Sequence, residues 1–126
     1  MDKETLQSIC IPPQTTIKGA IQSLNVTAKK ILCVTDSDGR LLGTISDGDV
    51  RRALLKGYSF DESVERIMAR DYRAVSRNEE NPRARAKALM KEHKLAHIPL
   101  LDETQRLLDI MAWTDFLENG EENSAP

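Results

Sequence analysis

The sequence predicts an α/β fold in which one structural unit is built twice, and three observations support this prediction. Residues 36–42 (DSDGRLL) return as residues 102–108 (DETQRLL), 66 positions later. Extended without gaps over residues 17–51, the same shift gives six identities, where about two are expected by chance. Helix and strand signals also follow one order in both halves. We therefore expect one globule of two halves, with repeat 1 over residues 1–60, repeat 2 over 61–119, and a disordered tail or truncated linker over 120–126.

The first half predicts a helix, a hairpin and a second helix. Apolar residues recur at helical spacing over residues 17–24. Apolar runs over 31–34 and 41–45, separated by a turn signal, predict two strands joined as a hairpin. A second helix is expected to start after Ser46 and to end at Gly57, because glycine suits the left-handed position that follows a helix.

The second half predicts the same order of elements. Asn81 and Pro82 suit the cap and the first position of a helix that runs to about His93. Strands are expected over 97–101 and 107–111. The other expected pieces are a short helix over 62–68 in the connection, a helix over about 114–117, and its end near Gly120.

Composition and charge exclude several classes of protein. With 18 basic and 20 acidic residues and a pI near 5.7, the chain has no overall positive field to attract nucleic acid or an anionic membrane. No run of 18 apolar residues occurs and the start lacks the form of a secretory signal, so we expect a cytoplasmic protein. Cys10 and Cys33 are expected to be buried free thiols rather than a disulfide or a metal site.

The sharpest local chemistry lies in residues 43–49 (GTISDGD), where a strand leads into a helix through a tight turn. The first backbone N–H groups of that helix point beyond the strand end, where the helix dipole favours a negative group such as phosphate. Ser46 offers a hydroxyl, Asp49 a carboxylate suited to the paired hydroxyls of a ribose, and Gly48 permits close approach. Arg51, at the fringe of the buried stripe, is the candidate phosphate contact, whereas Arg52 is expected in solvent or at a partner surface.

The same residues have a structural interpretation that needs no ligand. Ser46 and Asp49 have the spacing of a capping box, in which each side chain accepts a hydrogen bond from the backbone N–H of the other. The aspartates are a weak magnesium signal because no third acidic partner is in view. His93 and His97 end a helix and begin a strand, so we expect no metal pair. No phosphate loop, dinucleotide fingerprint or nucleophile elbow occurs, and we expect no catalysis by this chain.

These motifs resemble a tandem pair of CBS (cystathionine-β-synthase) domains, also called a Bateman module, over roughly residues 6–117. The resemblance lies in DSDGRLLGTISDGDVRRAL (residues 36–54) and in HIPLLD (residues 97–102). SDGDVRR (residues 46–52), followed by LKG, is similar to the CBS pair that precedes a sugar-phosphate nucleotidyltransferase domain. Related stretches also occur in CBS pairs that follow sugar-phosphate isomerase domains.

The resemblance implies two β-α-β-β-α repeats packed about a pseudo-two-fold axis, with two clefts between their sheets. In such modules a Ser or Thr three residues before an Asp holds the ribose and phosphate of an adenosine-type nucleotide (AMP, ADP or ATP), which corresponds to Ser46 and Asp49. The full candidate set adds Thr44, Gly48, Arg51, Ile9, Ile31 and Leu32 in the first half, and Val75, His97, Ile98, Pro99 and Asp115 in the second. The second copy departs from the pattern, because Ala112 replaces the hydroxyl, Trp113 a small or acidic residue, and Asp109 the glycine.

The resemblance thus implies a regulatory nucleotide-binding module, with the nucleotide as regulatory ligand rather than catalytic cofactor. We expect it to control a nucleotidyltransferase domain in cis that follows Pro126. The alternatives are a purely structural dimerisation module with vestigial clefts, or the CBS pair of a sugar-phosphate isomerase. A homodimer is expected, because helix faces that include Val50, Ala53 and Leu54 remain only partly covered.

Overall fold

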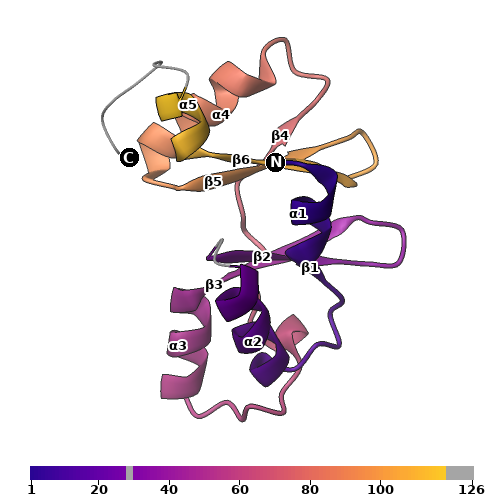
Figure 1. The fold of residues 1–126 in the computed structure, drawn as a ribbon, viewed down its shortest axis with the longest axis vertical. Coiled ribbons are helices and arrows are strands. Elements are labelled where there is room, and N and C mark those ends of the chain that lie inside the picture. Colours follow the sequence, from indigo (N-terminus) through magenta and orange to yellow (C-terminus); the bar gives the residue numbers. More distant parts are fainter. Residues whose placement is uncertain (28–29, 119–126) are drawn as a thin grey trace. The chain divides into compact units, whose positions relative to one another are not determined.

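The computed structural model describes residues 1–27 and 30–118 and divides into two compact units, each built on a three-stranded sheet (Figure 1). The first unit comprises Asp2–Tyr72, and the second begins at Arg73 and also includes Met1. The division falls after Tyr72, later than the boundary after residue 60 that the sequence led us to expect. The reason is that the connecting segment bonds back to the first half: the Ile17 N–H donates to the Glu62 carbonyl at 2.9 Å, and the Val64 N–H to that of Thr15 at 2.8 Å.

The first unit is a sheet of order β1-β2-β3 with helices on it. Its elements are α1 (Lys3–Ser8), β1 (Cys10–Ile11), α2 (Ile17–Thr27), β2 (Ile31–Thr35), β3 (Leu41–Ser46), α3 (Asp47–Leu55) and the 3-10 turn η1 (Val64–Arg66). β1 runs parallel to β2, and β2 and β3 form an antiparallel hairpin with a bulge between Val34 and Thr35. The helices α2 and α3 lie against this sheet and bury their apolar stripes on it.

The second unit repeats this topology with the order β4-β5-β6. Its elements are β4 (Val75–Ser76), α4 (Pro82–His93), β5 (His97–Leu101), β6 (Leu107–Ala112) and α5 (Trp113–Glu118). β4 is parallel to β5, and the β5–β6 hairpin has its bulge between Leu100 and Leu101, at the same place as the first. The strands of the two hairpins differ by the 66 positions found in the sequence, which confirms the repeat and the mixed α/β fold.

The hairpin turn is the most faithfully repeated detail. The carboxylate Oδ1 of Asp36 accepts from the backbone N–H groups of Asp38 and Arg40, at 2.9 and 3.0 Å. The Oδ1 of Asp102 accepts from the backbone N–H groups two and four residues later in the same way, at 2.8 and 2.9 Å. Both turns need a residue with positive φ, which is Gly39 at 85° in the first and Gln105 at 72° in the second. Positions 36 and 102 are both aspartate because the same hydrogen bonds hold the turn in each repeat.

The helix ends follow the predicted signals. Ser46 caps α3, and Gly57 follows its end with a φ of 96°. Asn81 caps α4 by accepting from the Ala84 N–H, and Pro82 takes the first turn. These boundaries are confirmed, whereas the expected end near Gly120 and the tail lie outside the described residues.

Two elements differ from expectation. The helix α1 was not predicted, because none of its residues is buried and it carries no apolar stripe; Asp2 caps it by accepting from the Thr5 N–H at 2.7 Å. The helix predicted over residues 62–68 is wrong in extent: only the 3-10 turn η1 forms. The following residues pair instead with β3, where Thr44 and Ala69 exchange two backbone hydrogen bonds of 3.0 and 2.8 Å.

Gly43 permits this close approach of the connecting segment to β3. A Cβ at this position would lie 2.7 Å from the Met68 side chain and 2.9 Å from the Ala69 carbonyl oxygen. Met68 is itself buried, so the segment that leaves η1 is part of the core of the first unit.

Both cysteines are free, as predicted, and they are register partners on β1 and β2. Cys33 is fully buried, and burial together with the neighbouring Cys10 raises the pKa of its thiol. Cys10 is half-buried and donates its S–H to the Leu6 carbonyl at 3.2 Å. No helix in the described part of the chain is both long and apolar enough to cross a membrane.

Candidate functional site

The turn between β3 and α3 places Ser46 and Asp49 in direct contact. The Asp49 N–H donates to Ser46 Oγ at 3.2 Å, and the Ser46 N–H donates to Asp49 Oδ2 at 2.9 Å. The Ser46 hydroxyl also donates to Oδ2 at 3.0 Å. The turn is thus a complete capping box, which confirms the capping interpretation of Ser46 and Asp49.

The second oxygen of the Asp49 carboxylate has a different environment. Its Oδ1 accepts one hydrogen bond of 2.8 Å from Arg52, whose side chain is 61% exposed, while that of Asp49 is 18% exposed. A carboxylate oxygen accepts about two hydrogen bonds. Oδ2 is therefore saturated by the cap, whereas Oδ1 retains one acceptor position that solvent reaches.

The two arginines lie on the faces of α3 that helical angle predicted, but the arginine beside Asp49 is not the one expected. Arg52 is the residue next to Asp49, although it is exposed as predicted. Arg51 lies on the other side of α3, where it lines an apolar groove together with Val50 and Leu54. The structure therefore brings Arg52, and not Arg51, to the Ser46–Asp49 turn.

The remaining candidate residues are distributed over both units. Thr44, Gly48, Ile9, Ile31 and Leu32 lie in the first unit with Ser46 and Asp49, and Val75, His97, Ile98, Pro99 and Asp115 lie in the second. The side chains of Ile9, Leu32 and Ile98 are 0% exposed. These three can offer a ligand only their backbone groups, and their side chains form the core.

The second copy of the turn keeps half of the capping box. The Ala112 N–H donates to Asp115 Oδ2 at 2.8 Å, as the Ser46 N–H does in the first copy, but the serine hydroxyl is missing. Trp113 is 5% exposed and packs into the core of this unit, with its ring 6.2 Å from that of Phe116. The tryptophan therefore fills the core, and its indole N–H has no hydrogen-bond partner among the described residues.

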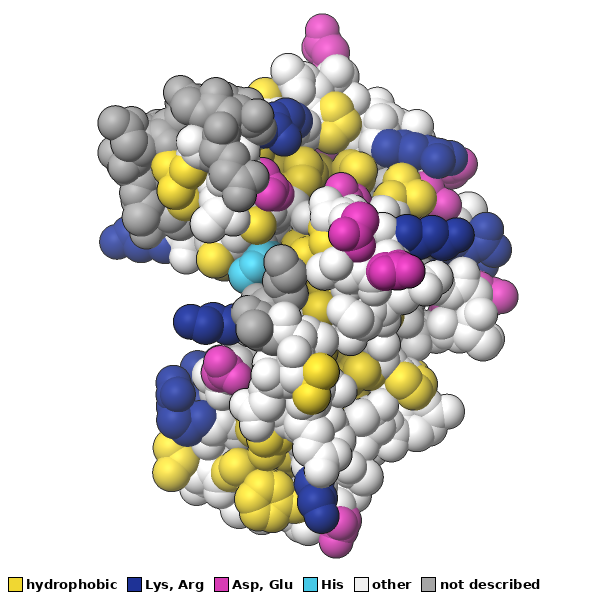
Figure 2. All heavy atoms as spheres, in the orientation of Figure 1, with side chains coloured by type: hydrophobic (Ala, Val, Ile, Leu, Met, Phe, Trp, Pro, Cys, Tyr) yellow, Lys and Arg dark blue, Asp and Glu magenta, His cyan; other side chains and the backbone are white. Residues whose placement is uncertain are grey.

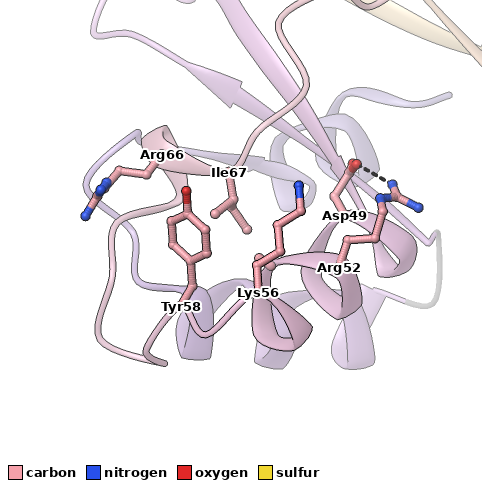
Figure 3. A pocket seen from close by; sticks show the side chains of 7 residues that line it. Asp49, Arg52, Lys56, Tyr58, Arg66 and Ile67 are labelled. Atoms are coloured by element: carbon pink, nitrogen blue, oxygen red, sulfur yellow. Dashed lines mark hydrogen bonds and ion pairs between the residues drawn. The ribbon is translucent and has the colours of Figure 1, made fainter.

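Sequence reasoning missed a pocket beside α3, which we call the cationic pocket (Figure 3). It has a volume of about 150 Å³, and its lining residues are Asp49, Arg52, Ala53, Lys56, Tyr58, Arg66 and Ile67. Asp49, Arg52, Ala53 and Lys56 share one helix face, because they recur at intervals of three or four residues. This spacing can be read from the sequence. The other three come from the connection, which showed no periodic pattern.

Within the described ranges 1–27 and 30–118, no three His, Cys, Asp or Glu side chains lie close enough together to hold a metal ion. His93 lies at the end of α4, 3.7 Å from Glu92, and His97 lies in β5.

Comparison with known families and proteins identifies what this arrangement is similar to. Residues 4–56 match the family model of the CBS domain. An uncharacterized protein of Helicobacter pylori is 27% identical over 121 residues, which cover 94% of this chain and 36% of that protein. A CBS domain-containing protein of Dictyostelium discoideum is 29% identical, over 82% of this chain and 78% of its own. The arabinose 5-phosphate isomerase of Pseudomonas aeruginosa is 26% identical, over 84% of this chain and 32% of the isomerase. The chain thus spans about a third of the length of the Helicobacter pylori protein and of the isomerase.

Solved structures share the fold over nearly the whole chain. The CBS domain structure NE2398 has a TM-score of 0.75 and 24% identity, and the match covers 95% of this chain and 97% of that one. CBSX2 in complex with AMP has a TM-score of 0.74 and 21% identity, with 88% and 85% covered. The protein PAE2072 from Pyrobaculum aerophilum, complexed with AMP, has a TM-score of 0.72 and 18% identity, with 89% and 88% covered.

Proposed function

We propose that this chain, which folds as a tandem pair of CBS domains, is a non-catalytic regulatory module that binds an adenine nucleotide (AMP, ADP or ATP) at the Ser46–Asp49 turn. The observation that carries the proposal is the free acceptor position on Asp49 Oδ1, at the start of a helix and within reach of solvent. A ribose hydroxyl can donate to this position without disturbing the cap, because the cap uses only Oδ2. Capping and ligand binding are then compatible roles of the same carboxylate.

The comparisons support an adenine nucleotide as the ligand. Two of the proteins that share this fold are bound to AMP. The helix dipole of α3 favours an anionic group near its N-terminus, which suits the phosphate of a nucleotide. The proposal places the chain in the cytoplasm, as the sequence predicts, with the regulatory nucleotide drawn from the pool there.

The proposed site lies in the first unit. The second unit has Ala112 in place of the hydroxyl and Trp113 within its core, so it lacks the groups that the first unit offers. Its Asp115 retains the hydrogen bond to the turn, which a structural cap requires in any case. We propose one nucleotide for each chain.

Nucleotide binding is proposed to control an attached enzyme that acts on a sugar phosphate. The motif around α3 favours a nucleotidyltransferase, whereas the match to an arabinose 5-phosphate isomerase favours an isomerase. The coding sequence on either side of this chain distinguishes the two.

A thermal-shift panel tests the proposal directly. A ligand at a hundredfold excess over its dissociation constant stabilises the folded state by about 2.7 kcal/mol, which is a visible rise in melting temperature. The panel contains AMP, ADP, ATP, GTP and S-adenosylmethionine. A rise with an adenine nucleotide is expected, and no rise with any member at millimolar concentration would contradict the proposal.

A second candidate function is dimerisation, and an apolar groove between α2 and α3 favours it. Ile21, Leu24, Val50, Leu54 and Leu55 supply its apolar lining, and Leu55 is 81% exposed. Figure 2 shows hydrophobic side chains at the surface over these helices, at the lower end of the view. Exposed apolar area of this kind is typical of an interface, here with a second copy of the chain.

Light scattering after gel filtration measures the oligomeric state. A dimer is expected for the native chain and a monomer for Leu55→Glu, because a charge in the groove opposes association. A monomeric native chain at tens of micromolar would exclude dimerisation as the function and leave nucleotide binding untouched.

A further inference from the structure

The cationic pocket extends the proposed function, on which this inference rests. We propose that it holds the outer phosphates of the nucleotide whose ribose contacts Asp49, so that the chain prefers a nucleoside triphosphate or diphosphate to AMP. The inference rests on the length of the pocket, on the unpaired donors within it and on the rigidity of its wall.

The pocket lies along one face of α3, from Asp49 to the C-cap Lys56. Asp49 lies in the first turn of this helix and Lys56 at its C-cap, which places their Cα atoms roughly 10 Å apart along the helix axis. The phosphate of a monophosphate would end near Asp49, whereas the added phosphates of ADP or ATP would extend toward Lys56. A lysine on a helix leans toward the N-terminus, which brings its ammonium closer to that path.

Two donors in the pocket have no partner among the residues that the structure describes. The Lys56 ammonium has no hydrogen bond or ion pair, and the Tyr58 hydroxyl has no hydrogen bond. Both groups point toward the same side, next to Ile67 (Figure 3). They can bind a phosphate oxygen without first breaking a contact within the protein.

The other charges of the pocket are balanced by neighbours. Arg52 bonds to Asp49, and Arg66 forms an exposed ion pair with Glu62, which lies beside the pocket. Lys56 therefore supplies the excess positive charge. Arg66 also stacks over the Tyr58 ring, with its Cζ 5.5 Å from the ring centroid.

The wall that carries Tyr58 is fixed by the backbone. Gly57, with a φ of 96°, turns the chain after α3, and the Tyr58 N–H donates to the Ala53 carbonyl at 3.1 Å. Ala53 is buried, so this bond joins the pocket wall to the core. The Tyr58 backbone is therefore positioned before any ligand arrives, which lowers the entropic cost of binding at this wall.

Isothermal titration of the whole chain with ATP, ADP, AMP and inorganic tripolyphosphate tests the inference. The buffer contains no magnesium, because a bound cation would mask the phosphate charge. ATP is expected to bind the native chain about tenfold more tightly than AMP. Lys56→Met is expected to weaken ATP about fivefold or more and to leave AMP unchanged, as the loss of one partly exposed charged contact predicts. Tyr58→Phe, which removes only the hydroxyl, is expected to show the same pattern with a smaller effect.

Lys18→Met is the matched control. Lys18 is an exposed residue of α2 outside the pocket lining, and the change removes the same charge. Equal affinity for ATP and AMP in the native chain would overturn the inference and leave the proposed function standing. An equal loss of ATP affinity in the Lys18 and Lys56 variants would also overturn it, because the effect would then be one of net charge. Binding of tripolyphosphate without binding of any nucleotide would overturn both proposals.

Discussion

Replacing Asp49 by alanine separates the two roles of its carboxylate. The change removes the acceptor Oδ2 of the capping box and the ion pair of Oδ1 with Arg52. Ser46 can still accept from the backbone N–H at position 49, so the change removes only one half of the capping box, at a cost of up to about 1 kcal/mol of folding free energy. The ion pair adds only about 0.2–0.5 kcal/mol, since the Arg52 side chain is 61% exposed and solvent screens it. We therefore expect a loss of about 1–1.5 kcal/mol in unfolding free energy, or roughly 5 °C in melting temperature.

The effect on nucleotide binding is expected to be larger than the effect on the cap. A hydrogen bond to a charged group contributes about 1.5–3 kcal/mol, so AMP should bind roughly tenfold to a hundredfold more weakly to Asp49→Ala. Asn81→Ala is the matched control, because it removes the cap of α4 in the other unit at a similar cost in stability. Denaturant unfolding gives the stabilities, and calorimetric titration gives the affinities. If Asp49→Ala and Asn81→Ala lose equal stability and both bind AMP as the native chain does, Asp49 acts only as the N3 partner of the capping box and the ribose assignment is refuted.

Three further results are expected. Gly43→Ala should lower the unfolding free energy by about 2 kcal/mol or more in urea titrations, because the new Cβ would lie 2.7 Å from the Met68 side chain; unchanged stability would show that the segment moves freely. Gln105→Gly should raise stability by about 0.5 kcal/mol, since φ is 72° there, and a loss would mean that strain is absent. The hydrogen bond from Thr104 holds the pKa of Asp102 below the ordinary value of an aspartate, and the hydrogen bond from the Arg40 N–H does the same for the pKa of Asp36. The stability that these carboxylates contribute is present above about pH 4 and is lost as the pH falls through the lowered pKa. When the unfolding free energy is measured as a function of pH, Asp102→Asn should therefore lose less stability below about pH 4 than the native chain does.

The sequence predicted the elements that carry a periodic or capping signal. The 66-residue shift located both hairpins to within a residue, because Asp36 and Asp102 make the same local hydrogen bonds. The ends of α3 and α4 followed from Ser46 and Asn81, whose side chains act on their own helices. Hydrogen bonds between residues that are close in the chain can therefore be predicted from a single sequence.

Contacts between distant segments were not visible in the same way. The backbone pairing of Thr44 with Ala69 determines where the first unit ends, but no sequence pattern around either residue predicts this pairing. In the site, Arg52 rather than Arg51 contacts Asp49, because residues three apart share a helix face, whereas Arg51 lies beside the apolar groove. The wall of the cationic pocket depends on the fold of the connection around Tyr58 and Arg66, which only the structure provides.

Trp113 has a practical consequence, because it is the single tryptophan of the chain and lies in the core of the second unit. Its fluorescence therefore reports the melting of that unit alone, while circular dichroism follows both. The nucleotide is proposed to bind in the first unit, so the tryptophan gives an optical signal from the unit that does not carry the proposed site. If adding AMP moves the fluorescence transition together with the dichroism transition, the two units unfold cooperatively. The size of the fluorescence shift then measures the free energy that one unit transmits to the other, which is the quantity a regulatory module needs.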